Sequence, residues 1–347
     1  MSVPPPFEPE GPLLPAIRPP APLIELVPPA GDPAPSPPAP APRPPRYGRA
    51  LALFVLTFLC TTTLGPVMYL SARTDVTTDL IYVLDLPTIR AVWSDPELLR
   101  IGFAFSIPAM LILLAHELGH YFTCRFYRLD CSPPYFLPVP INFGTFGAFI
   151  RIREPLRTKK VLFDVGISGP IAGFVTLIPF LLYGIAHSEP VPLRVGGPES
   201  DFALLSLGHP LLIDLCARLF HGPLASGTYL NLHPMAMAAW LGLLATSLNL
   251  LPLGQLDGGH ILYAATGSLQ RRLAIPLWLA LGGVGYYWPG WFLWCAIVLL
   301  IGLFHPPVRD EGEPLDRGRR WLAWLALAMF VLSFAPIPIE AIPVAPP

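Results

Sequence analysis

Two histidines and a glutamate in the first half of the chain have the spacing of a metal-dependent hydrolytic site. His116, Glu117 and His120 form the pattern H-E-x-x-H within residues 111–125. Residues four apart share one face of a helix, so both imidazoles can meet one metal ion. Glu117 is placed beside the first histidine, where it can act on a metal-bound water. The pattern indicates a zinc peptidase, although chance matches occur.

The sequence around this pattern is apolar enough to cross a membrane. No charged residue occurs in 101–114, and the whole chain is 53% hydrophobic and 13% charged, with a mean hydropathy of +0.55. A typical soluble domain carries roughly 25% charged residues. We therefore expect an integral membrane protein that contacts the lipid bilayer. The net charge of -1 gives no basic surface for nucleic acid. A metal helix on a membrane-spanning stretch fits a protease that cuts inside the bilayer better than a soluble one.

The five cysteines are odd in number and form no C-x-x-C, so a disulfide framework is not expected. Cys124 follows His120 by four residues and would share its helical face. A fourth protein ligand would close the position that catalysis needs open, which argues against a metal role for Cys124.

The first 46 residues have a different composition from the rest. They hold 19 of the 47 prolines and no periodic apolar pattern. Such a segment cannot bury a core, and we expect a disordered cytoplasmic tail with polyproline-II character. It lacks the basic and apolar regions of a signal peptide. Stretches such as Pro42–Pro45 offer a docking motif, but a solvated tail is the favoured interpretation.

The remaining chain predicts an all-α polytopic membrane protein with about six to seven transmembrane helices. Crossing the bilayer takes about 20 apolar residues. The expected spans are 50–70, 101–122, 162–186, 230–251, two short spans within 273–304 that turn near Pro289, and 321–335. The domains follow from these: a tail at 1–46, a first transmembrane helix and extracytoplasmic loop at 47–100, a metalloprotease core at 101–265 and C-terminal transmembrane helices at 266–347.

Two segments between the spans call for other structures. Residues 131–152 are apolar but rich in Pro and Gly, so they cannot form a regular span. We expect 143–152 to be a re-entrant extended element, a β-hairpin buried in protein or lining a cavity; a surface loop is the alternative. Within the loop 187–228, residues 203–220 predict an amphipathic helix at the membrane interface.

Lys and Arg predict the orientation of the spans. With a cytoplasmic N-terminus and every span crossing, 17 of the 22 Lys and Arg residues lie on the cytoplasmic side. The same topology brings His116, His120 and Asp257 to the cytoplasmic ends of their helices.

Asp257 is the candidate for a third metal ligand. Two histidines do not complete a catalytic zinc site, which usually takes three protein ligands and a water. A carboxylate in a membrane-embedded sequence is costly unless it is paired or binds a cation. Pro252 and Gly254 break the helix before it and free the backbone to turn the carboxylate inward. The alternative is an aspartate at a helix end, stabilised by water.

Together with N-x-x-P-x-x-x-x-D-G on a later span, H-E-x-x-H becomes a strong signal, and the sequence resembles the site-2 protease family of intramembrane zinc metalloproteases. The matching positions are His116, Glu117, His120, Asn249, Pro252, Asp257 and Gly258, with 143–150, 166–173 and His233-Pro234. The resemblance covers about residues 100–265. It implies membrane helices with one zinc ion held by His116, His120 and Asp257, in the compact bacterial or plastid type without a PDZ domain.

The expected activity is hydrolysis of peptide bonds within or next to transmembrane helices of membrane protein substrates, as in regulated intramembrane proteolysis. Glu117 takes a proton from water and later delivers it to the leaving amine. Asn249 hydrogen-bonds the substrate backbone or the oxyanion, or else packs between helices. The expected location is a bacterial inner membrane.

Three alternatives remain open: another type of membrane zinc peptidase, a membrane metal transporter or sensor, and a silent homologue that binds zinc. His260 is interpreted as a polar residue at a helix start, and His305 as an interfacial cap.

Overall fold

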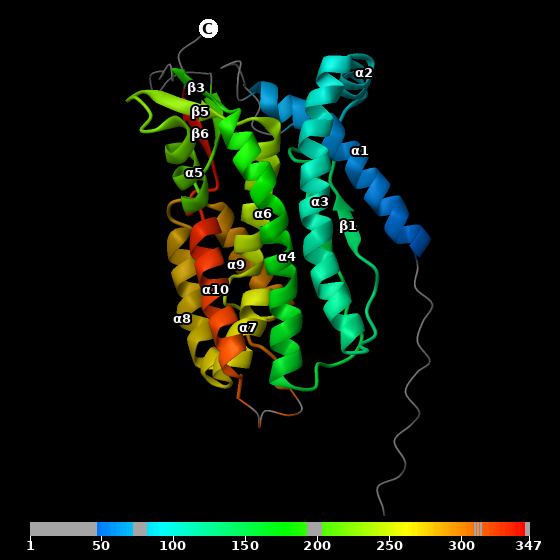
Figure 1. Ribbon diagram of the computed structural model, residues 1–347, viewed down its shortest axis with the longest axis vertical. Coiled ribbons are helices and arrows are strands. Elements are labelled where there is room, and N and C mark those ends of the chain that lie inside the picture. Colours follow the sequence, from blue (N-terminus) through cyan, green and yellow to red (C-terminus); the bar gives the residue numbers. More distant parts are fainter. Residues whose placement is uncertain are drawn as a thin grey trace, which may run out of the picture. The chain divides into compact units, whose positions relative to one another are not determined.

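The computed structural model describes residues 47–71, 82–192, 203–308, 310, 312 and 314–343 (Figure 1). The tail at 1–46, expected to be disordered, lies outside the described residues. Helices form most of the described chain, and short antiparallel strand pairs connect them.

Among the described residues, three helices are long and apolar enough to cross a membrane: α1 (Tyr47–Ser71), α3 (Pro96–Phe126) and α4 (Lys159–Ala186). Asp95 starts α3 by accepting hydrogen bonds from the backbone N–H groups of Glu97 and Leu98, and Pro96 takes the first helical position. The 31 residues of α3 extend over about 46 Å, more than the roughly 30 Å of a hydrocarbon core.

The expected six to seven spans are not matched by helices of sufficient length in the described chain. The run 230–251 is divided, because Thr228–Asn231 forms strand β5 and Pro234 starts α6 (Pro234–Asn249). At 16 residues, α6 falls short of the length that spans a bilayer alone. Four helices of 10 to 17 residues follow: α7 (Asp257–Thr266), α8 (Leu269–Val284), α9 (Gly290–Ile301) and α10 (Arg317–Ser333). The turn near Pro289 is confirmed.

Residues 131–152 contain an antiparallel hairpin of β1 (Tyr135–Pro138) and β2 (Thr145–Phe149). A hairpin was expected at 143–152, but only the second strand lies in that range, and the first strand precedes it. Past that strand, Ser132 donates its backbone N–H to the Arg151 carbonyl, and Arg151 donates its own to the Ser132 hydroxyl. Backbone groups alternate along an extended chain. Arg151 therefore directs its backbone groups toward the segment that leads into β1, and Phe149, two residues earlier, directs its own toward β1. The backbone groups of Ala148 and Ile150 alternate with these and point away from β1.

The segment expected to be one amphipathic helix at 203–220 is two elements. Residues Ala203–Leu207 form β4, which pairs with β6 (Ile339–Pro343), and only Leu211–His221 forms a helix, α5. Pro210 lies between them and precedes the helix. Residues 203–207 form a strand and not a helix because β6, far along the chain, supplies their hydrogen-bond partners. The remaining elements are α2 (Leu86–Ser94) and β3 (Glu189–Pro192), which pairs with β5.

The core lies where α3, α4 and α6 pack together (Figure 1). Glycines bring the backbones close, because a Cβ on Gly119 of α3 would lie 2.4 Å from the Ser168 carbonyl oxygen of α4. On α4, a Cβ on Gly184 would lie 2.3 Å from the backbone nitrogen of Ala236 in α6. Such approaches are typical of membrane helices, whose association has little hydrophobic driving force.

Candidate metal centre

The two histidines of the H-E-x-x-H pattern face each other on α3. The Nε2 atoms of His116 and His120 are 3.1 Å apart, and both residues are buried. The Nδ1 atom of His120 lies 2.7 Å from the Val165 carbonyl oxygen in α4. A carbonyl only accepts, so Nδ1 donates and the Nε2 lone pair is left toward His116.

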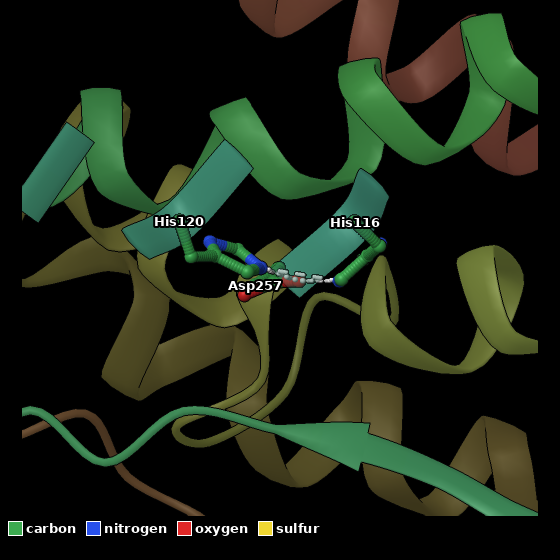
Figure 2. Close-up of side chains that lie close together, drawn as sticks. All are labelled: His116, His120 and Asp257. Atoms are coloured by element: carbon green, nitrogen blue, oxygen red, sulfur yellow. Dashed lines mark hydrogen bonds and ion pairs between the residues drawn. The ribbon is translucent and has the colours of Figure 1, made fainter. Parts of the chain in front are cut away.

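Asp257 reaches the same point from the first residue of α7 (Figure 2). Its Oδ2 atom lies 3.3 Å from Nε2 of His116 and 3.2 Å from Nε2 of His120. The expected meeting of the three side chains, from two distant parts of the chain, is therefore present in the structure.

The turn before Asp257 explains the glycines around it. Gly254 has a φ of 55°, a left-handed conformation that favours glycine. A Cβ on Gly258 would lie 2.0 Å from the Leu250 carbonyl oxygen, and one on Gly259 would lie 2.3 Å from that of Gly254. The chain thus folds back against the first turn of α7, and this close packing sets the position of Asp257.

The three side chains have the donor set of a catalytic zinc site. Their ligand atoms, two imidazole nitrogens and one carboxylate oxygen, lie within 4.8 Å of one another. Zinc takes such ligands, and three from the protein leave a fourth position open. The bond from His120 to Val165 is the support that metal-binding histidines usually have through their other ring nitrogen. The residues present therefore fit zinc.

Glu117 is buried on the same helix and lines the same cavity. Its carboxyl group lies near the backbone N–H of Ile150, just after β2, on the opposite side of this cavity. This contact places the glutamate between the metal centre and the hairpin, where it does not belong to the ligand group.

The cavity at this centre has a volume of about 220 Å³. It is lined by His116, Glu117, His120, Ala148, Phe149, Ile150, Ile152, Val165, Asn249, Gln255, Leu256, Asp257 and His260. The hairpin thus forms one wall, and α3, α4 and the turn into α7 form the others.

Asn249, the last residue of α6, also lies at the cavity. Its Nδ2 atom is 3.3 Å from Nε2 of His116. The lone pair on that nitrogen cannot serve the amide and a metal ion together. With a metal bound, the Asn249 amide is left for another partner in the cavity.

Other candidates fall elsewhere. Cys124 is buried against Cys131 and Leu129, and it is not part of the ligand group. His260 lines the cavity and contacts His305, which the sequence placed at separate helix ends. The distance of three residues from Asp257 puts His260 on the same face of α7 and is a signal that points to it. Nothing in the sequence points to His305.

A buried centre of two histidines and one aspartate with an adjacent glutamate, on a helix long enough to span a membrane, has the side chains of a metallopeptidase site. The model of peptidase family M50, the site-2 protease family, matches residues 104–276. The chain belongs to this family, which confirms the resemblance drawn from its motifs. The spanning helices and the family make it an integral membrane protein.

Several relatives with curated descriptions carry zinc metalloprotease names. The chain is 29% identical over 247 residues to "Probable zinc metalloprotease EGY2, chloroplastic" of Oryza sativa subsp. indica, covering 69% of this chain and 42% of the relative. It is 28% identical over 235 residues to "Probable zinc metalloprotease EGY1, chloroplastic" of Arabidopsis thaliana, covering 65% and 41%.

The chain therefore spans less than half the length of these relatives. No solved structure matches it. Since the relatives are named as chloroplastic plant proteins, they do not support the expected bacterial inner membrane.

Proposed function

We propose that this protein is an intramembrane zinc metalloprotease that hydrolyses peptide bonds within or next to the transmembrane helices of membrane proteins. One observation carries the proposal. Asp257 lies 3.2–3.3 Å from both histidines of a helix long enough to span a membrane, beside a buried glutamate that is free of the ligand group.

In this proposal His116, His120 and Asp257 hold the zinc ion. When bound, zinc lowers the pKa of a coordinated water to roughly 7 and polarises the scissile carbonyl. Glu117 accepts a proton from the attacking water, whose oxygen bonds to the carbonyl carbon. As the C–N bond breaks, Glu117 returns the proton to the departing amine.

Asn249 is proposed to hydrogen-bond the substrate at its reacting carbonyl or an adjacent backbone group. Its support is its place on the cavity wall, 3.3 Å from a ligand nitrogen that a metal would occupy. An amide donor aimed at a developing oxyanion is worth about a hundredfold in kcat or more. Asn249→Leu should lower kcat and leave zinc content unchanged, whereas loss of zinc would give Asn249 a structural role.

The hairpin is proposed to hold an unwound substrate strand by edge pairing. A helical substrate conceals its amide groups, so cleavage needs an extended segment. The backbone of Ala148 points away from β1 at the cavity wall, where it can pair with such a segment. Ala148→Pro removes this N–H and should impair cleavage with zinc retained, while Ala148→Ser keeps the N–H and should cleave normally. Unchanged cleavage by the proline variant would contradict the edge-pairing role.

We further propose that the shorter helices are membrane-embedded, giving the six to seven crossings that hydropathy predicts, with His116 and Asp257 toward the cytoplasmic side. The support is apolar side chains on the outside of α9 and α10: Leu300 is 87% exposed, Trp321 75% and Trp324 65%. Spin labels at these positions should report lipid in reconstituted protein, and a water-exposed signal would rule out the embedding.

The decisive experiment uses Glu117→Gln, which preserves size but cannot accept the proton. Membranes from cells with wild-type protein are compared with membranes from cells with the variant, by mass spectrometry of transmembrane fragments. We expect fragments that accumulate only with Glu117→Gln, at equal zinc content. Glu97→Gln, the same change at the exposed start of α3, is the matched control and should resemble wild type. No accumulation with zinc bound in both would leave a zinc-binding but silent homologue, or a metal sensor.

A further inference from the structure

His260 and His305 meet beside the metal centre although 45 residues separate them. His260 is the fourth residue of α7, and its Nδ1 atom lies 2.8 Å from Nε2 of His305 in the segment after α9. The His305 ring is buried and stacks on Tyr263, with ring centroids 4.3 Å apart. A Cβ on Gly166 of α4 would lie 2.9 Å from the His260 Cβ, so α4 holds His260 from the other side.

The hydrogen bonds of this pair have one consistent direction. Nδ1 of His305 lies 2.5 Å from the Pro306 carbonyl oxygen, which only accepts, so that nitrogen carries the hydrogen. Burial lowers the pKa of His305 and keeps the ring neutral, so its Nε2 holds a lone pair. Nδ1 of His260 must therefore be the donor between the rings.

This direction leaves His260 with an unprotonated Nε2. A second proton on Nε2 would have no acceptor among the described residues, so the ring is neutral. His260 lines the cavity, and its Nε2 makes no hydrogen bond to any residue that the structure describes. It also lies outside the group of three ligand side chains. His260 thus offers the cavity a neutral hydrogen-bond acceptor. His305, which does not line the cavity, sets the tautomer of His260.

We propose that His260 binds the substrate backbone, its Nε2 accepting a hydrogen bond from an amide N–H of the unwound peptide, and that His305 is a positioning residue that sets the tautomer of His260. This inference rests on the proposed peptidase function. An extended peptide alternates donors and acceptors. In that scheme Asp257 serves the metal and Glu117 the proton, so neither carboxylate is free to receive a peptide N–H. His260 is available for that bond.

Two substitutions separate the parts of this proposal. His260→Asn keeps a donor near the Nδ1 position toward His305 but removes the acceptor at Nε2. His305→Phe keeps the ring stacked on Tyr263 but removes the acceptor that orients His260. His187→Phe is the matched control, because His187 is exposed and stacks on Tyr183 outside the cavity. Purified full-length variants in detergent are compared for zinc content and for cleavage of fluorophore-labelled casein, an unstructured probe.

We expect His260→Asn to lower kcat/KM roughly tenfold through KM, the effect of one lost hydrogen bond, with zinc content unchanged. A synthetic peptide around the mapped casein cleavage site is then N-methylated at one amide at a time. One position should cost wild type about tenfold and cost His260→Asn nothing further. Equal losses in both proteins at every position, or loss of zinc from His260→Asn, would overturn the inference.

A spectroscopic measurement tests the positioning role apart from turnover. In ¹⁵N-histidine NMR of the full-length protein, His260 should show a protonated Nδ1 and a bare Nε2 in wild type. In His305→Phe it should shift toward the other tautomer; a protonated Nε2 in wild type would overturn the proposal. Casein cleavage that is absent from wild type and Glu117→Gln alike would instead remove the proposed function.

Discussion

Helices α4 and α8 both carry glycines in apolar sequence, but these glycines have opposite surroundings. On α4, an added Cβ would lie 2.1 Å from Nε2 of His120 at Gly169, 3.1 Å from the His116 Cβ at Gly173 and 2.9 Å from the His260 Cβ at Gly166. On α8, Gly283 would meet nothing within 4 Å, and Gly282 would meet the Cys295 sulfur at 3.9 Å.

The difference shows what α4 contributes to the metal centre. It supplies no ligand, yet it is one wall against which three imidazoles are placed, and Gly166, Gly169 and Gly173 each leave room for one of them. A glycine inside a helix costs roughly 0.5–1 kcal/mol relative to alanine. At α4 this cost is offset by close packing of the site; at α8 no contact of the described chain offsets it.

Removal of a metal ligand is expected to cause the largest loss of activity. Asp257→Ala should reduce peptidase activity by roughly three orders of magnitude or more, because the metal loses a protein donor and its transition-state stabilisation. Zinc content, measured by atomic emission on the purified protein, should fall from one per chain to a small fraction. Full zinc occupancy would remove Asp257 from the ligand set.

Gly169→Ala should come next, with activity reduced about a hundredfold. The new methyl group would occupy the place of the His120 imidazole, and a shift of about 1 Å at a catalytic site costs on this order. Zinc affinity, from competition with a chelating dye, should fall together with activity. An unchanged affinity would mean that α4 moves as a whole, and that its contact does not position the histidine.

Gly166→Ala should have an intermediate effect and a different signature. The methyl group presses on the His260 Cβ at 2.9 Å, so α7 must give way by a few tenths of an ångström. We expect roughly a tenfold lower kcat/KM with zinc retained. In the His260→Asn background, Gly166→Ala should cause little further loss, since both substitutions disturb one contact. Additive losses would separate Gly166 from His260.

Gly283→Ala is the smallest expected effect and the internal control. Because nothing lies within 4 Å, activity and zinc content should match wild type. Stability in detergent should stay equal or rise by up to about 1 kcal/mol, from the better helix propensity of alanine. A large loss of activity would show that α8 contacts a functional partner, and the contrast with α4 would then fail.

Local features of this protein could be predicted well from its sequence. The face shared by His116 and His120 follows from helical periodicity, and the Pro and Gly content of 131–152 excludes a regular span. The cost of a carboxylate in a membrane pointed to Asp257. The bounds of the span expected at 230–251 were less successful, because hydropathy does not reveal that β3 takes Thr228–Asn231 as a strand partner.

The class of chemistry could be predicted from short motifs, since neighbours along a helix or turn have a spacing that local geometry sets. The packing of the helices determines which distant groups meet: Glu117 and Ile150 at one cavity, His260 with His305, and the α4 glycines with the imidazoles. The physical reason is that these contacts depend on how helices pack. That packing sums many weak interactions along the whole chain, so no short pattern carries it.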